Sequence, residues 1–215
     1  MRLRVARQDD AEAILDIYRP IVLDSHISFE YEPPDAAEMR RRIGRTLEDY
    51  PWIVAEDEGD DGRLLGYAYA VRFRGREAYD WSAETTIYVS PGRKRAGVGR
   101  VLIHGLLRCM REQGFHVAVA GIALPNPDSV AFHECVGFEK SGIVRRAGYK
   151  AGHWRDIGFW QFELRRADED APAAGTRLAP PRPFRELPLD DVEGWLRASA
   201  EAGSHPQPPG ADMLR

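Results

Sequence analysis

The chain has 215 residues, 43% of them hydrophobic and 30% charged, which is the composition of an ordinary globular protein with one good-sized core and an appendage. Its formal net charge of −4 gives no electrostatic reason to expect nucleic acid as a partner. No apolar run approaches the roughly 20 residues of a membrane span, and Met1–Val5 begins as a strand rather than as a leader, so we expect no membrane partner. Cys109 and Cys135 lie on predicted helix faces as buried free thiols, which suits a cytoplasmic protein.

After the initial strand, the first part of the chain predicts two helices and two further strands. Asp9 is placed to cap a helix, with Glu12 three residues on, and Asp35 is placed to cap a second helix after two prolines. Residues 52–55 form a short apolar run that is typical of a strand. Residues 65–73 alternate in polarity, which predicts a long strand with one apolar face.

The middle of the chain continues this alternation of strands and helices. The predicted elements are, in order, a strand that ends at Val89, a helix from Val98, a strand over 115–123, a helix that begins after Asn126 and ends near Gly137, and strands over 138–147 and 154–164. The resulting order, β-α-α-β-β-β-α-β-α-β-β, predicts a single α/β domain whose mixed, largely antiparallel central sheet is covered by helices.

The composition changes at about residue 167, and the predicted domain therefore covers residues 1–166. Residues 167–215 form a Pro-rich tail whose prolines cannot continue a sheet. This tail predicts a short helix near residues 190–201, and we expect its remainder to be disordered or to lie over the surface. On this interpretation, removing residues 172–215 leaves the core folded.

A glycine-rich junction connects the strand that ends at Val89 with the helix that begins at Val98. It contains three cations and the glycines Gly92, Gly97 and Gly99. At the start of a helix several backbone N–H groups lack partners and favour an anion, and glycine lets the main chain approach a pyrophosphate without a Cβ in the way. The junction therefore predicts a phosphate site, with a glycine-rich surface turn as the alternative.

Two motifs that the sequence does not contain narrow the type of phosphate ligand. The sequence has no Gly-x-x-x-x-Gly-Lys-Ser/Thr run of a P-loop, and the junction does not match the Gly-x-Gly-x-x-Gly of a dinucleotide site. Residues 94–99, Lys-Arg-Ala-Gly-Val-Gly, instead resemble the Gln/Arg-x-x-Gly-x-Gly/Ala loop of the GNAT acetyltransferase superfamily, apart from Lys94 at the first position. The resemblance implies the GNAT fold and acetyl-CoA as co-substrate. The residues that it implies for acetyl-CoA binding are Ile87, Tyr88, Val89, Arg95, Ala96, Gly97, Val98, Gly99, Arg100 and Asn126. The histidines His26, His104, His116 and His153 show no ligand spacing, so we expect no metal.

Further segments resemble phosphinothricin acetyltransferases and the related methionine sulfoximine acetyltransferases. These segments are Tyr79-Asp80-Trp81-Ser82-Ala83-Glu84, Leu124-Pro125-Asn126 with Ser129-Val130, and His133-Glu134-Cys135-Val136-Gly137-Phe138. The likeness covers roughly residues 3–165 and implies acetyl transfer to a small-molecule amine. It also implies a homodimer, for which the aromatic strand 154–164 is a candidate interface.

Glu84 and His133 are the candidate catalytic residues. The resemblance implies that Glu84 acts as general base through a water molecule, whereas a solvated carboxylate at a strand end is the alternative. The resemblance also places His133 where many GNAT proteins carry a tyrosine that protonates the leaving thiolate, whereas a packed, hydrogen-bonded helix residue is the alternative. Finally, it implies that the backbone N–H of Val89 stabilises the thioester oxyanion, which requires a bulge or a splay in the sheet.

The loop before the catalytic strand is expected to contact the substrate. Arg74 and Arg76 form a guanidinium pair suited to a carboxylate or a phosphinate, whose paired oxygens match a planar fork. Without the resemblance, loop arginines are more often simply solvated. The candidate substrate-binding residues are Arg74, Arg76, Tyr79, Glu84 and Thr85.

Together these patterns predict an acetyl-CoA-dependent N-acetyltransferase that acts on the α-amine of a small amino-acid-like acid. Direct transfer is expected because no cysteine or serine is placed beside a base as a nucleophile. An alternative within the fold is acetylation of another amine, such as a peptide N-terminus or a polyamine, and the arginine pair argues against the polyamine. A catalytically silent CoA-binding module is the alternative from a different class, and the presence of both Glu84 and His133 speaks against it.

Overall fold

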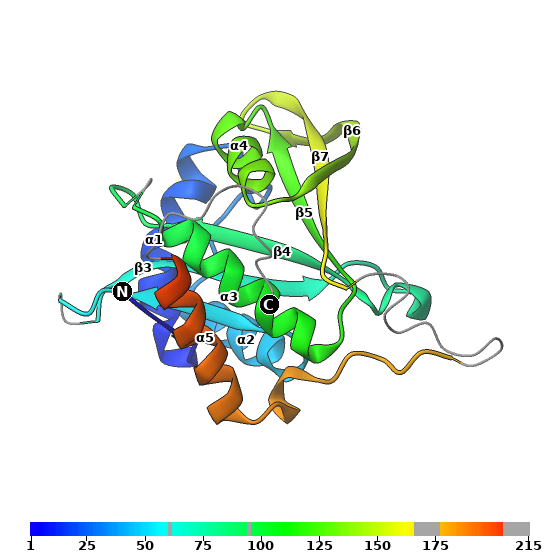
Figure 1. The fold of residues 1–215 in the computed structure, drawn as a ribbon. Coiled ribbons are helices and arrows are strands. Elements are labelled where there is room, and N and C mark those ends of the chain that lie inside the picture. Colours follow the sequence, from blue (N-terminus) through cyan, green and yellow to red (C-terminus); the bar gives the residue numbers. More distant parts are fainter. Residues whose placement is uncertain (60–61, 94–95, 166–176, 204–215) are drawn as a thin grey trace.

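A seven-stranded sheet runs through the computed structural model, which describes residues 1–59, 62–93, 96–165 and 177–203 (Figure 1). The strands are β1 (Arg2–Val5), β2 (Trp52–Glu56), β3 (Leu64–Arg72), β4 (Ser82–Val89), β5 (Val117–Leu124), β6 (Glu139–Lys150) and β7 (His153–Glu163). They lie in the order β1-β2-β3-β4-β5-β7-β6, and every neighbouring pair is antiparallel except β4 and β5. The prediction of a mixed, largely antiparallel sheet is confirmed.

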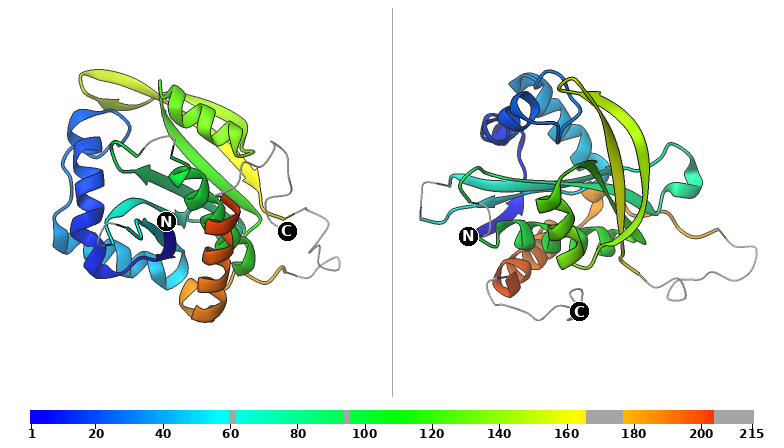
Figure 2. Two further views of the ribbon diagram at one scale, coloured as in Figure 1. Left: turned by 60° about the vertical axis from the view of Figure 1, so that its left-hand side comes forward. Right: turned by 90° about the horizontal axis from the view of Figure 1, so that it is seen from above.

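Helices cover both faces of this sheet. They are α1 (Ala11–Asp24), α2 (Ala36–Asp49), α3 (Val98–Gln113), α4 (Pro127–Cys135) and α5 (Leu189–Gly203). Seen from above, α1 and α2 lie on one side of the sheet and α3 and α5 on the other (Figure 2). Within the described ranges, none of these helices is both long and apolar enough to cross a membrane.

The predicted helix starts are confirmed at Asp35 and wrong at Asp9. Asp35 caps α2, because its carboxylate accepts the N–H of the residue three positions on at 2.7 Å. Before α1, the chain forms a 3₁₀ turn at Gln8–Asp10, so that Asp10 takes the position at the helix start. The Asp10 carboxylate pairs with the guanidinium of Arg4 at 2.7 Å, and this tertiary contact explains why the start lies one residue later than the local pattern indicates.

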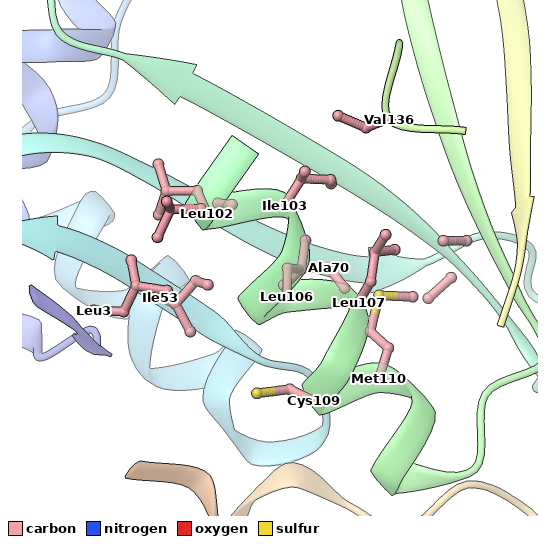
Figure 3. Packing of buried hydrophobic residues seen from close by; sticks show 14 of the residues in the cluster. Leu3, Ile53, Ala70, Leu102, Ile103, Leu106, Leu107, Cys109, Met110 and Val136 are labelled. Carbon is pink, nitrogen blue, oxygen red and sulfur yellow. The ribbon is translucent and has the colours of Figure 1, made fainter. Parts of the chain in front are cut away.

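The main core lies between α3 and the sheet (Figure 3). Leu102, Leu106 and their neighbours on α3 are fully buried against Ile53 and other sheet residues. The expectation that β3 has only one apolar face is wrong, because helices cover both of its faces and Tyr67 and Ala68 are both buried.

Of the two cysteines, Cys109 is buried in the core as predicted. Cys135 is exposed, which corrects the expectation of a buried thiol. The short helix α4 ends at Cys135, so this residue lies at the end of the element.

Helix α5 completes the core on the α3 side. The helix expected near residues 190–201 spans Leu189–Gly203, and its Val192 and Leu196 are buried with α3 and β1. The close approach depends on Gly105 of α3, where an added Cβ would lie 2.8 Å from Leu3 and 3.1 Å from Leu196. Residues 166–176 and 204–215 lie outside the described part of the chain. Helix α5 therefore packs on the core, and the expectation that the core stays folded without residues 172–215 stays a prediction.

We expect Leu196→Ala to lower the free energy of unfolding by about 2–5 kcal/mol, because it leaves a cavity among fully buried side chains. The measurement is equilibrium unfolding in urea with the slope checked for two-state behaviour. The exposed neighbour Arg197 provides the control, since Arg197→Ala should change the free energy by less than about 0.5 kcal/mol. Equal effects of both substitutions would mean that α5 does not pack on the core in solution.

Candidate active site

The parallel strands β4 and β5 part at the centre of the sheet. Their register runs from Ser82 opposite Val117 only as far as Thr85 opposite Ala120, although both strands continue beyond these residues. A cavity of about 80 Å³ lies where they separate. It is lined by residues 85–88 of β4, residues 120–123 of β5, Ile27, and Asn126, Ser129 and His133 at α4.

The parting of the strands leaves one edge of β4 without its neighbour in the sheet. The N–H of Ser90 donates to the carbonyl of Leu65 on β3 at 2.8 Å. Because successive N–H groups of a strand point to opposite sides, the N–H of Val89 is directed away from β3 and toward the gap. The splay required for an oxyanion donor is therefore present, and the role of this N–H stays a prediction.

Glu84 lies on β4 one residue before the register with β5 ends. Burial raises the pKa of its carboxyl, and the nearby positive charge of Arg74 partly offsets this rise. The carboxylate lies over bare backbone of the neighbouring strand, because a Cβ added at Gly121 would be 3.0 Å from Glu84 Oε1. Glu84 is thus a partly desolvated carboxylate beside the gap, which differs from the alternative of a solvated group at a strand end.

His133 is a packed residue of α4 that also lines the cavity. Its Nδ1 lies 2.8 Å from the carbonyl oxygen of Ser129, which can only accept, so Nδ1 carries the hydrogen and Nε2 of the neutral ring has the lone pair. Phe132 and Phe138 contact the imidazole edge to face, with ring centroids 5.2 and 5.1 Å away. Burial lowers the pKa of His133, while the bond to Ser129 raises it by less.

The start of α3 has the geometry of an anion site. Gly97 precedes the helix with φ +79°, a left-handed conformation that favours glycine, and a Cβ there would meet open space. The first N–H that bonds back into the helix is that of Val101, to the Gly97 carbonyl at 3.1 Å. The N–H groups of the three preceding residues, Val98, Gly99 and Arg100, are therefore the ones that a helix leaves for an anion. Ala96 is exposed beside them, whereas Arg95 and Lys94 lie outside the described residues.

Asn126 connects the cavity with α4. Its Oδ1 accepts the N–H of Ser129 at 3.2 Å, so it is a helix cap, and it also lines the cavity. Both predicted roles of Asn126 are compatible with this position, and its contact with acetyl-CoA stays a prediction. Across the gap, Ile87 and Tyr88 contribute to the lining from β4.

Among the loop candidates, Arg74 lies near enough to Glu84 for its positive charge to act on the carboxyl. The Arg74 guanidinium stacks over the ring of Phe73 at 4.8 Å. Tyr79 contacts the same ring edge to face at 6.1 Å, and Arg76 is exposed just before the 3₁₀ turn Glu77–Tyr79. Arg74 and Tyr79 thus contact the same aromatic ring in the loop before β4.

Thr85, the remaining substrate candidate, has a different environment. It is buried, and its hydroxyl donates to the carbonyl of Val119 on β5 at 3.2 Å. Because side chains alternate along a strand, Thr85 lies on the opposite face of β4 from Glu84. It fixes the last paired position of β4 and β5 and also forms part of the cavity lining.

The sequence did not predict the segment over the gap, residues 25–32 after α1. Ile27 lines the cavity, and His26 Nε2 contacts the carbonyl of Pro125 at 2.9 Å. The buried Lys150 at the end of β6 donates from Nζ to the carbonyl of Val22 at 2.9 Å and to that of Glu30. These contacts join segments more than 90 residues apart, and no local pattern in the sequence signals them.

No group of His, Cys, Asp or Glu side chains that could hold a metal occurs in the described part of the chain.

We expect Gly97→Val to weaken acetyl-CoA binding at least about tenfold, because a β-branched residue is strained at this positive φ and would shift the first N–H groups of α3. Calorimetric titration with acetyl-CoA measures the affinity. The matched control is Gly152→Val, which places the same strain, at φ +76° and with open space for a Cβ, in the turn between β6 and β7. An unchanged affinity in folded Gly97→Val would contradict a pyrophosphate site at this junction.

Comparison with known proteins agrees with this geometry. The family model for the acetyltransferase (GNAT) domain matches residues 3–158. A phosphinothricin N-acetyltransferase of Streptomyces viridochromogenes is 41% identical over 189 residues, which cover 87% of this chain and 94% of that protein. An L-methionine sulfoximine/L-methionine sulfone acetyltransferase of Pseudomonas paraeruginosa is 34% identical over 163 residues, or 75% of this chain and 94% of that protein.

Among solved structures, a GNAT superfamily phosphinothricin acetyltransferase from Sinorhizobium meliloti in complex with AcCoA is similar with a TM-score of 0.74 and 37% identity. The match covers 80% of this chain and 93% of that one. The sheet with its parted central strands, the glycine start of α3 and these matches lead to one conclusion. The chain belongs to the GNAT acetyltransferase family and is an acetyl-CoA-dependent N-acetyltransferase.

Proposed function

We propose that the protein transfers the acetyl group of acetyl-CoA directly to the α-amine of a small amino-acid-like acid of the phosphinothricin or methionine sulfoximine type. The observation that carries this proposal is a partly desolvated carboxylate, Glu84, which lies beside the gap between β4 and β5 and within reach of the positive charge of Arg74. The names of the relatives support the same class of acceptor.

Glu84 is the group suited to remove the proton from the amine. An α-amine is largely protonated near neutral pH, so a base must take its proton before the nitrogen can attack a carbonyl carbon. The raised pKa of Glu84 makes it a stronger base than an exposed glutamate, and it acts directly or through one water molecule. Acetyl-CoA supplies the activated thioester, and the N–H of Val89, directed into the gap, is the donor proposed for the developing negative charge.

Direct transfer agrees with the position of the two thiols. Cys109 is fully buried in the core, and burial raises its pKa to about 12, so it does not form a thiolate near neutral pH. Cys135 is exposed at the end of α4, with its sulfur 3.5 Å from the Arg100 guanidinium, and is not part of the cavity lining. Neither sulfur lies beside Glu84 as an acyl acceptor.

We assign His133 to the wall of the cavity as a neutral imidazole. With its hydrogen on Nδ1 held by Ser129, the neutral ring can accept a proton at Nε2 and cannot donate one there. Protonation of a leaving thiolate would need the imidazolium, which burial disfavours. The acid role that the resemblance implies is therefore the weaker part of the catalytic assignment.

The homodimer and the cytoplasmic location belong to the proposal as well. The β6–β7 hairpin carries Ile143, Val144 and Trp154 with exposed fractions of 44%, 51% and 62%. Exposed apolar side chains gathered on one hairpin are suited to an interface. Size-exclusion chromatography with light scattering measures whether the chain is a dimer.

The test of the acceptor class is release of free CoA with a panel of acceptors. The panel contains free amino acids, phosphinothricin, methionine sulfoximine, a peptide with a free N-terminus and a polyamine. We expect the amino-acid-like acids to react fastest. Faster reaction of the peptide or of the polyamine would replace the proposed acceptor, and CoA release with none of them would favour a binding module.

We expect Glu84→Gln to lower kcat by about 10²–10⁴-fold, because a general base acts in the transition state, and to leave acetyl-CoA affinity unchanged. The wild-type rate should fall as the pH falls through the raised pKa of Glu84, since only the carboxylate accepts a proton. The variant should lack this acid limb and recover in part at high pH, where free amine forms. The exposed Glu139→Gln serves as the control. A variant with normal turnover at all pH values would place the base elsewhere.

Replacing Arg74 and Arg76 together by glutamine should raise the acceptor KM at least about tenfold, because charge-assisted bonds to the acid group are lost. Acetyl-CoA affinity should not change. Amides of the same amino acids should be poor substrates of the wild type, and a simple alkyl amine of similar size should react feebly with both proteins. Equal rates for amides and free acids would exclude recognition of an acid group.

A further inference from the structure

The segment between the last strand and α5 passes the loop before β4, where the candidate acceptor residues lie. We call residues 177–188 the strap. In Figure 1 it is the orange chain that passes from the loop before β4 to the base of α5. The match to the GNAT family model ends at residue 158, before the strap begins.

The strap holds the loop at two points. The indole Nε1 of Trp81 donates to the carbonyl of Ala179 at 2.9 Å, and the Arg177 guanidinium pairs with Glu77 at 2.9 Å. The two contacts lie on either side of Tyr79. Residues 74–79 are all exposed, so this part of the loop has little buried surface of its own and depends on such tethers for its order.

The other end of the strap is fixed to the core. The N–H of Arg182 donates to the carbonyl of Gln113 at 2.8 Å, and the amide of Gln113 donates back to the Arg182 carbonyl at 2.8 Å. Gln113 is 2% exposed and also donates to the carbonyl of Asp49, so it joins the ends of α2 and α3 to the strap. Phe184 and Leu187 are buried in the main core. The strap is thus a rigid support rather than a loose tail.

Trp81 connects this support to the catalytic strand. Its backbone carbonyl accepts the N–H groups of His116 at 2.9 Å and Val117 at 3.2 Å, where β5 begins. Its indole is held by the strap, and Glu84 follows three residues later on β4. The residue that ends the loop is therefore held on both sides, by β5 through its backbone and by the strap through its side chain.

We propose that the strap is a positioning element for the acceptor, which holds loop 74–81 so that Arg74, Arg76 and Tyr79 face the substrate next to Glu84. This inference rests on the proposed function, because it assigns the acceptor to this loop. The strap acts through the loop, and none of its residues is among those that line the cavity or begin α3. Its loss should therefore change acceptor binding and leave acetyl-CoA affinity unchanged.

The experiment uses the full-length double variant Trp81→Phe, Arg177→Gln, which removes both tethers and keeps an aromatic ring and α5. Because a lost neutral hydrogen bond is typically about 1 kcal/mol, we expect the acceptor KM to rise about fivefold, with kcat and acetyl-CoA affinity within about twofold of wild type. Trypsin should cleave after Arg74 or Arg76 faster than in wild type. The single variant Arg177→Lys, which keeps the charge at residue 177 and leaves Trp81 in place, should have an acceptor KM and a tryptic cleavage rate close to those of the wild type.

The matched control is Arg185→Gln, which breaks the pairs of the strap with Glu48 and Asp49, at 3.0 and 3.5 Å, at the end away from the loop. The control should leave the KM and tryptic cleavage of the loop unchanged. An acceptor KM and a cleavage rate like those of the control would overturn the proposal. A parallel loss of kcat, acetyl-CoA affinity and melting temperature would also overturn it, since it would make the strap merely stabilising. If the wild type acetylates no amino acid but the double variant is still cleaved faster, the proposed function is contradicted, whereas the tether between the strap and the loop is supported.

Discussion

The parallel pairing of β4 and β5, and its early end, is the constraint on which the rest of the site depends. Two parallel neighbours need a crossover connection, and here that connection is α3. The chain leaves β4 at its carboxyl end and enters α3 through the glycine-rich junction, so the N-terminus of the helix lies at the end of the sheet where the strands part. The proposed phosphate site and the gap thus both follow from the parallel crossover from β4 through α3 to β5.

The alternation of side chains on β4 divides the site between two faces. Ile87 and Val89 pack with the α3 core, while Tyr88 contacts Tyr18 of α1 at 5.4 Å on the other face. Glu84 shares the face of Tyr88, since the two are separated by an even number of residues. Glu84, the proposed base, thus lies on the face of β4 that α1 and α2 cover, whereas the opposite face of the strand belongs to the core under α3. In the proposed reaction, β4 can contact both acetyl-CoA and the acceptor only because the end of the strand has no neighbouring strand along one edge.

Local patterns in the sequence were sufficient for most elements and for the chemistry that sits at their ends. The Asp35 cap, the apolar face of α3 and the Gly97 start all depend on interactions within a few residues, and each is present as predicted. Glu84 was found by resemblance, and its burial could be learned only from the structure.

The features that sequence patterns did not predict arise from contacts between distant segments. The burial of α5 depends on the absence of a side chain at Gly105 of α3. Phe184 and Leu187 are buried in the core, although they lie in a Pro-rich stretch whose composition did not predict packing. The cover of residues 25–32 over the gap depends on hydrogen bonds to segments near residues 125 and 150. Such contacts do not recur at a regular residue spacing, so no short stretch of the sequence predicts them.

The engagement of Lys150 has a consequence for an enzyme that acetylates amines. The chain contains only three lysines among its 30 Lys and Arg residues, and a lysine amine is a potential target of the enzyme's own chemistry. Lys150 is 6% exposed, and its ammonium hydrogens are directed at the carbonyls of Val22 and Glu30, with the ring of Tyr31 5.4 Å away. An amine held in this way cannot turn a lone pair toward a thioester, whereas arginine, the prevailing cation of this chain, is a poor nucleophile throughout. The same hydrogen bonds that fasten the segment after α1 to the end of β6 therefore keep this amine from reacting with an acyl donor.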